Sequence, residues 1–257
     1  MKTQIIKKVV DDVASWIDDA EVVNEENSDN ELAFRPELPI NFEQKCPVVL
    51  VCDVSGSMHG SPIRELNKGL QEFQIQIMND HIASQRLDCC VISFASGVKI
   101  EQNFALIDQF RMPSLHTSGT TQMVSAVFKG IEQVVARKKW YKDTGQTYYP
   151  PFIILLTDGY PDRDQDVEAL RQAIQKGYYG RHFLFWAFGV EGADMNLLKS
   201  LGHEGSIIQK IKGIEFVKFF RWLSNSMEAF SRSKPDEVPH IAPRNENENP
   251  FQVKVPS

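Results

Sequence analysis

Residues 46–58 of the 257-residue chain read CPVVLVCDVSGSM. The run from Pro47 to Cys52 is apolar and partly β-branched, which is typical of a strand buried on both faces of a mainly parallel sheet. The strand ends at Asp53. After a polar loop, Ser61-Pro62 offers an N-cap with proline at the first position of a helix, which apolar spacing extends over 61–77. This order of strand, loop and helix predicts an α/β unit.

The same alternation continues along the chain. Further strands are expected over 87–94, 98–104, 152–156, 182–188 and 206–209. Further helices are expected over 121–136, 166–176, 194–201 and 214–231. The short turn at 95–97 predicts that the strands before and after it pair in antiparallel fashion at one edge. We therefore predict a doubly wound, Rossmann-like α/β fold, with a mainly parallel central sheet, one antiparallel edge strand and helices on both faces.

Composition divides the chain into a globular domain over 46–232 and two flanking segments. Residues 1–45 begin with apolar side chains at helical spacing over 5–17, which predict an amphipathic helix, and continue as an acidic arm. That helix has two interpretations, packing on its own domain or docking a partner. Residues 233–257 carry five prolines and little periodicity, so we expect this tail to be disordered.

Charge and hydropathy exclude several classes of protein. Lys and Arg total 28 against 34 Asp and Glu, and the net charge of −6 argues against nucleic-acid binding. Mean hydropathy is −0.30, and no apolar run approaches the roughly 18 residues of a membrane span. Asp11 and Asp12 interrupt any secretory signal, so we expect a cytoplasmic protein. The four cysteines form no C-x-x-C pair and are expected to be reduced core residues.

Three loops expected at the carboxyl ends of strands carry oxygen-bearing side chains. The first holds Asp53, Ser55 and Ser57, the second brings Thr121 to the start of a helix, and the third places Asp158 after a buried strand. Such loops converge at one edge of an open α/β sheet. Two carboxylates and three hydroxyls suit a hard divalent cation, so we expect Mg²⁺, with Mn²⁺ as its competitor.

The pattern Asp53-x-Ser55-x-Ser57, followed by a separate Thr121 and a separate Asp158, resembles the metal-ion-dependent adhesion site of the von Willebrand factor A (vWA) family. The resemblance implies that Ser55, Ser57 and Thr121 coordinate the metal directly, while Asp53 and Asp158 act through water. The hydroxyl of Thr120 is an alternative to that of Thr121. We prefer Thr121 because residues 118–121 read SGTT, where the family pattern is Ser-Gly-Gly-Thr with the ligand last.

Four segments are similar to the bacterial tellurium-resistance TerY-type branch of this family. They are LVCDVSGSMHGSPIRELNKGLQ (50–71), SGTT (118–121), IILLTDGYPDRD (153–164) and FFRWLSNSMEAFSRS (219–233). This resemblance implies a cytosolic binding protein, encoded beside a protein kinase and a metal-dependent protein phosphatase, in a stress-response or phage-defence system.

A metal held by three protein oxygens keeps an open position that an Asp or Glu of a protein partner can fill. We therefore expect a Mg²⁺-dependent protein-interaction module and no enzymatic activity. The enzyme alternative is a phosphoryl-transfer protein of the haloacid-dehalogenase type. That pattern needs an aspartate two residues after the nucleophile, where this chain has Ser55. A third reading, a regulatory subunit switched by phosphorylation, would use Ser224, Ser226, Ser231 and Ser233.

Two further stretches bear on binding. The basic and aromatic residues of 137–151 (RKKWYKDTGQTYYPP) predict an exposed interaction loop, with a flap folded onto its own domain as the alternative. The acidic residues of 162–166 lack the glycine and glutamate of a calcium loop and are interpreted as the start of a helix. His59 is expected to be a solvated loop residue.

Overall fold

The computed structural model describes residues 38–190, 192–203, 206–211 and 216–232. The predicted helix over 5–17, most of the acidic arm and the tail over 233–257 lie outside the described residues.

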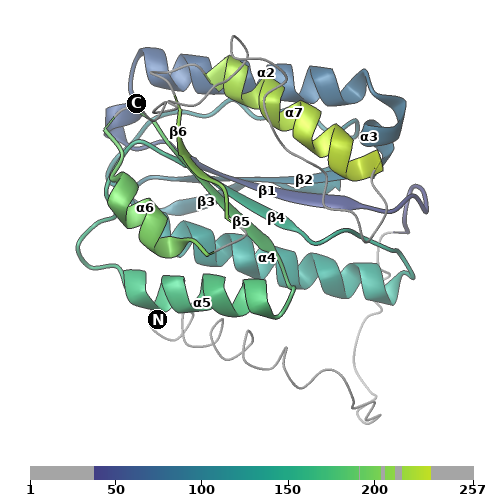
Figure 1. Ribbon diagram of the computed structural model, residues 1–257. Helices are drawn as coiled ribbons and strands as arrows, with labels where there is room; N and C mark the ends of the chain where they lie inside the picture. The colour runs from purple at the N-terminus through teal and green to yellow at the C-terminus, as the bar shows by residue number, and fades with distance from the viewer. Residues whose placement is uncertain (1–37, 191, 204–205, 212–215, 233–257) are drawn as a thin grey trace, which may run out of the picture.

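A six-stranded sheet forms the centre of the domain (Figure 1), in the order β3-β2-β1-β4-β5-β6. Its strands are β1 (Cys46–Asp53), β2 (Leu87–Phe94), β3 (Val98–Leu106), β4 (Phe152–Thr157), β5 (Leu184–Gly189) and β6 (Ile208–Lys210). Only the pair β2 and β3 at the edge is antiparallel. The predicted fold class is therefore confirmed, because fully apolar strands such as β1 require a helix layer on each face.

The helices form one layer on each side of the sheet (Figure 1). One layer contains α2 (Ser61–Met78), α3 (His81–Arg86) and α7 (Phe216–Arg232); the other contains α4 (Met123–Asp143), α5 (Val167–Tyr179) and α6 (Met195–Leu201). Alternate residues of β1 face the two layers. Val48 and Leu50 belong to the core shared with α2 and α7, whereas Val49 and Val51 belong to the core shared with α4. Among the described helices, none is long and apolar enough to cross a membrane.

The expected interaction loop over 137–151 is wrong in its first half. Helix α4 continues to Asp143, and Tyr141 is fully buried. The helix extends because Arg137 reaches the buried Asp88, with 2.7 Å between Nε and Oδ2, and its guanidinium lies 3.8 Å from the Trp140 ring centroid. Tyr149 is also buried, so these aromatic residues fold onto their own domain.

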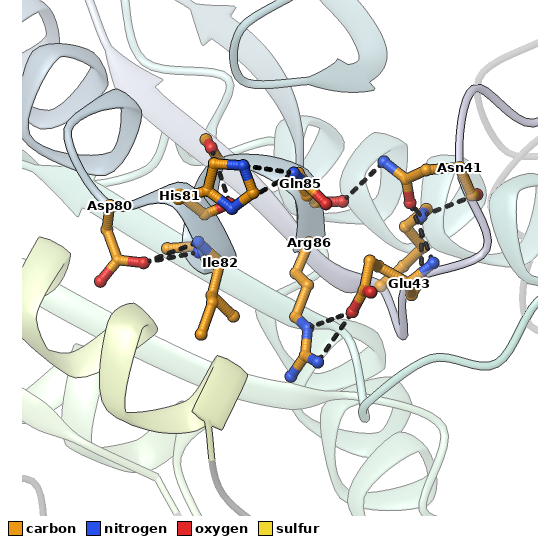
Figure 2. Close-up of polar contacts among 10 residues, drawn as sticks. Asn41, Glu43, Asp80, His81, Ile82, Gln85 and Arg86 are labelled. Atoms are coloured by element: carbon orange, nitrogen blue, oxygen red, sulfur yellow. Dashed lines mark hydrogen bonds and ion pairs between the residues drawn. The ribbon is translucent and has the colours of Figure 1, made fainter.

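The short helix α3 was not predicted, since its six residues carry little apolar periodicity. The Asp80 side chain caps it by accepting from the backbone N–H groups of Ile82 and Ala83, each at 2.9 Å. Figure 2 shows this cap and the contacts between α3 and the segment that leads into β1. Arg86 donates to Glu43 Oε2 from Nε at 3.0 Å and from Nη2 at 2.8 Å. These contacts fix the direction in which the chain enters β1.

The positions of two serines in α7 argue against regulation by phosphorylation at those residues. Ser224 and Ser226 lie in α7, are buried, and donate to the carbonyl oxygens of Phe220 and Trp222 at 2.9 Å. A kinase cannot reach them in the folded domain. The Ser231 side chain and Ser233 lie outside what the structure describes.

Candidate metal centre

The site lies where β1 and β4 end side by side. These strands are parallel neighbours with Cys52 opposite Leu156, so Asp53 and Asp158 follow adjacent strand ends. The adjacency follows from the sheet order, because the chain crosses from one half of the sheet to the other between these strands. The two carboxylates are 105 positions apart in the sequence and come from the two halves of the fold.

The loop after β1 fixes the first carboxylate. Asp53 is fully buried, its Oδ1 accepts from the Ser55 backbone N–H at 2.8 Å, and its Oδ2 accepts from Thr157 Oγ1 at 2.6 Å. The Ser55 and Ser57 hydroxyl oxygens lie 3.1 Å apart. The chain then turns through the short 3₁₀ helix Gly56–Met58. The D-x-S-x-S stretch therefore presents two hydroxyls beside a carboxylate of fixed orientation.

The second carboxylate contacts the same hydroxyls. Ser57 Oγ donates to Asp158 Oδ1 at 2.9 Å, which joins the loops that follow β1 and β4. Ser57 is exposed, whereas Asp158 retains only 8% of its surface. The two loops thus form a cluster of oxygen atoms that is exposed at Ser57.

Thr121, and not Thr120, faces this cluster. A Cβ atom built at Gly159 would lie 3.6 Å from Thr121 Oγ1 and 4.0 Å from Asp53 Oδ2, so both oxygens border the same space. The Thr120 hydroxyl instead donates to Asp162 Oδ2 at 2.8 Å, and Thr120 is exposed. The structure thus brings together all five residues predicted for the site.

The loop before α4 is held against the loop after β1 by backbone contacts. The N–H of Gly56 donates to the carbonyl oxygen of Gly119 at 3.1 Å, and that of Ser118 donates to Val54 at 2.8 Å. Gly119 has a φ of +56°, and a Cβ there would lie 1.9 Å from Ser96 Oγ. Only glycine satisfies both conditions, so this residue is needed where the two loops meet.

Sequence reasoning missed two groups that support the site. Thr157 orients Asp53, and its position directly before Asp158 was the available signal. Asp162 and Gln165 contact the segment around Thr121 across more than 40 positions, and no sequence pattern indicated this. Asp166 caps α5 by accepting from Ala169 N at 2.9 Å, as the helix-start interpretation requires. His59 is exposed, as expected, with Nδ1 3.3 Å from Thr117 Oγ1.

Electrostatics favour a cation at this position. Burial raises the pKa of the Asp53 carboxyl, and the charge of Asp158 raises it further; burial likewise raises the pKa of Asp158. Neither carboxylate forms an ion pair with any residue that the structure describes. A divalent cation would neutralise both, and oxygen ligands are what Mg²⁺ and Mn²⁺ prefer. The donor set therefore fits the expected metal.

Comparison with known proteins supports this picture. A family model described as the von Willebrand factor type A domain matches residues 48–216. A search among curated protein sequences found no match.

Solved structures share the fold at low sequence identity. A von Willebrand factor type A protein from Catenulispora acidiphila is 17% identical, with a TM-score of 0.53 over 72% of this chain and 43% of that one. A mutant of the PilB minor pilin of Streptococcus sanguinis is 14% identical, with a TM-score of 0.53 over 77% and 65%. The vWF domain of the type V pili tip protein Mfa5 of Porphyromonas gingivalis is 11% identical, with a TM-score of 0.51 over 77% and 99%. The chain thus spans less than two thirds of the first two structures.

Proposed function

Because this chain belongs to the von Willebrand factor type A domain family, we propose that it is a Mg²⁺-dependent protein-interaction module whose metal centre is the cluster at the ends of β1 and β4. The family is one of metal-dependent adhesion and protein-interaction domains. The observation that carries the proposal is the hydrogen bond of Ser57 to Asp158, which joins two loops into one oxygen-lined site.

In this proposal Ser55, Ser57 and Thr121 supply the direct protein ligands, as in the family pattern, and Asp53 and Asp158 act through water. Bound Mg²⁺ would supply an electrophilic centre for an incoming carboxylate, with Mn²⁺ as an alternative occupant. With the two carboxylates acting through water, less of the charge of a bound metal would be compensated, and its attraction for an anionic ligand would rise.

The partner is a protein that presents an Asp or Glu side chain to the open side of the site. Ser57 is exposed there, and Tyr160, two residues beyond Asp158, has 63% of its surface accessible. Exposed tyrosines beside a charged anchor are favoured at protein interfaces, because they bury a large apolar area and keep a polar tip. Tyr160 would therefore contact the residues that flank the partner's carboxylate.

We extend the proposal to a TerY-type role, in which the module scaffolds or regulates a bacterial stress-response or phage-defence system with a protein kinase and a phosphatase. Its support is the resemblance of the four segments at 50–71, 118–121, 153–164 and 219–233. A cytoplasmic location belongs to this extension, and the four free, buried cysteines agree with it.

We infer that the site does not catalyse phosphoryl transfer. Asp53, the residue that would act as nucleophile, is fully buried, and each of its oxygens already accepts a hydrogen bond. A nucleophilic carboxylate must be reached in line by the phosphorus, which the burial of Asp53 opposes. The residue two positions later is Ser55, so the general acid of a haloacid-dehalogenase site is missing as well.

The metal centre is tested by titrating the full chain with Mn²⁺, following free Mn²⁺ by electron paramagnetic resonance and adding Mg²⁺ as competitor. We expect Thr121→Ala to weaken Mn²⁺ binding by at least about tenfold. The exposed Asp164 provides the control, since Asp164→Asn removes one nearby negative charge without touching the cluster. Equal affinities for the wild type and Thr121→Ala would refute the assignment.

The interaction itself is tested by affinity capture from a native cell lysate, followed by mass spectrometry. The wild type is compared in Mg²⁺ and in EDTA, together with Asp53→Ala in Mg²⁺. A protein retained only by the wild type in Mg²⁺ supports a metal-bridged contact and identifies the system. Retention of the same protein in all three samples would show that the metal centre does not mediate binding.

A further inference from the structure

We propose that Asp162 and Gln165, in the loop between β4 and α5, are positioning residues that hold Thr121 at the metal centre and thereby set its affinity for metal. The inference rests on the proposed function, because it concerns the same site. It names two residues whose hydrogen bonds reach the backbone of Thr121.

The Asp162 carboxylate is bonded to three consecutive residues. Its Oδ1 accepts from the Thr121 backbone N–H at 3.2 Å, and its Oδ2 accepts from Thr120 Oγ1 and from Gln122 Nε2, each at 2.8 Å. Its own backbone N–H donates to the Thr121 carbonyl oxygen at 3.0 Å. Asp162 therefore forms hydrogen bonds with both the backbone N–H and the carbonyl oxygen of Thr121.

Gln165 adds a second donor to the same Thr121 carbonyl oxygen. Its Nε2 donates to the Thr121 carbonyl oxygen at 2.7 Å, and its Oε1 accepts from Val124 N at 2.7 Å. The residue at the N-cap of α4, Gln122, makes no side-chain cap bond of its own. Gln165 thus supplies the acceptor that the first turn of α4 needs, from about 40 residues away in the sequence.

These contacts link the positions of two metal-ligating segments. Asp158 and Asp162 belong to the same loop, so the segment that carries one carboxylate of the site also fixes Thr121. A ligand hydroxyl must be held within about 0.5 Å of its productive position to contribute fully. Without the hydrogen bonds of Asp162 and Gln165, metal binding would also have to order this segment, and that cost would reduce the net free energy of binding. Affinity should fall although every ligand oxygen remains.

The acidic stretch itself supplies matched controls, because its three aspartates are placed differently. Asp162 grips Thr121, Asp164 is exposed, and Asp166 caps α5. Replacing any of them removes one negative charge at a similar distance along the chain. A difference among the three alanine variants therefore reports on the hydrogen bonds and not on charge.

The experiment measures Mn²⁺ affinity of the full chain by electron paramagnetic resonance. We expect Asp162→Ala to weaken binding about tenfold, whereas Asp164→Ala and Asp166→Ala stay within about twofold of the wild type. In a Thr121→Ala background, Asp162→Ala should have less than about a twofold effect, because the hydroxyl that Asp162 is proposed to position is no longer present. An undiminished effect in that background would overturn the inference, since a general structural role would be additive.

A second measurement needs no metal. Hydrogen exchange of the backbone amides over 120–125, in EDTA, should be faster in Asp162→Ala and in Gln165→Met, which keeps side-chain length but loses both polar ends. Gln165→Met also serves if Asp162→Ala fails to fold. Faster exchange with unchanged Mn²⁺ affinity overturns the inference and leaves the proposed function intact. A wild-type chain that binds no Mn²⁺ overturns the proposed function, and the inference with it.

Discussion

Replacing Arg137 by methionine tests how the segment after residue 136 is bound to the domain. The guanidinium donates from Nε to Asp88 Oδ2 at 2.7 Å, and Asp88 is fully buried at the start of β2. The other donor to this oxygen is the Tyr141 hydroxyl. The second oxygen, Asp88 Oδ1, is buried and has no hydrogen-bond partner among the described residues. Arg137→Met therefore leaves a buried carboxylate with a single donor.

The expected loss follows from this burial. Removing one partner of a buried ion pair destabilises a protein by about 3–5 kcal/mol. The Arg137 side chain retains 18% of its surface, so water can reach the vacated space and the lower end of that range applies. Loss of the contact with the Trp140 ring, at 3.8 Å, adds about 0.5–1 kcal/mol, while methionine keeps much of the apolar packing. We expect a total of about 3–4 kcal/mol.

Urea unfolding followed by circular dichroism measures this loss. With a slope of about 2 kcal/mol per molar, the midpoint should fall by about 1.5–2 M at unchanged slope. The control is Lys139→Met on the same helix, whose partner Asp143 is exposed; it should shift the midpoint by less than about 0.3 M. A similarly small shift for Arg137→Met would refute the reasoning, since it would mean that Asp88 is hydrated in the folded state.

Three further predictions concern packing, pH and thiol reactivity. A Cβ at Gly69 would lie 2.5 Å from the Phe220 ring, so Gly69→Ala should destabilise the domain by about 1–2 kcal/mol. A Cβ at Gly130 would meet side chains no closer than 3.5 Å, so Gly130→Ala should stabilise it by about 0.5–1 kcal/mol. Urea unfolding should therefore show a lower free energy of unfolding for the first variant and a higher one for the second. Burial, assisted by nearby lysines, lowers the pKa of His182 from 6.5 to about 4. Below pH 6.5 the unfolded chain therefore binds a proton at His182 that the folded chain does not bind, and the folded state loses stability as the pH falls. Between about pH 7.5 and about pH 5, the free energy of unfolding should fall by about 1 kcal/mol more for the wild type than for His182→Gln, and equal losses would contradict this. Burial raises the pKa of Cys46 to about 12 and all four cysteines are buried, so the native chain should resist an aromatic disulfide reagent that labels four thiols after unfolding, and a fast-reacting native thiol would count against this packing.

The strands could be predicted because their apolar runs are a local property of the sequence. The predicted strand over 87–94 coincides with β2, and the runs at 47–52 and 152–156 lie within β1 and β4. Helix ends were predicted less well. The end of α4 at Asp143 depends on the contact of Arg137 with Asp88, which joins residues 49 positions apart. Helix α3 depends on a single cap residue, and its sequence has no apolar periodicity from which a helix could be predicted.

The five candidate site residues could be named from the sequence because their types and spacing lie in three short segments, each of which follows a strand or opens a helix; their role in binding metal stays a prediction. Oxygen chemistry alone could not choose between Thr120 and Thr121. In the folded domain the Thr120 hydroxyl donates to Asp162 and the Thr121 hydroxyl lies beside Gly159, which favours Thr121.

The sequence by itself determined the α/β fold class and the oxygen-only chemistry of the candidate site, because strand burial and side-chain type are local properties. Only the tertiary structure decided that Tyr141 and Tyr149 are buried against their own domain, and that Asp162 and Gln165 hold the segment around Thr121. The reason is physical. A hydrogen bond or ion pair between distant segments depends on the distance and direction of two groups, and these exist only after the sheet and its helix layers have brought the segments together.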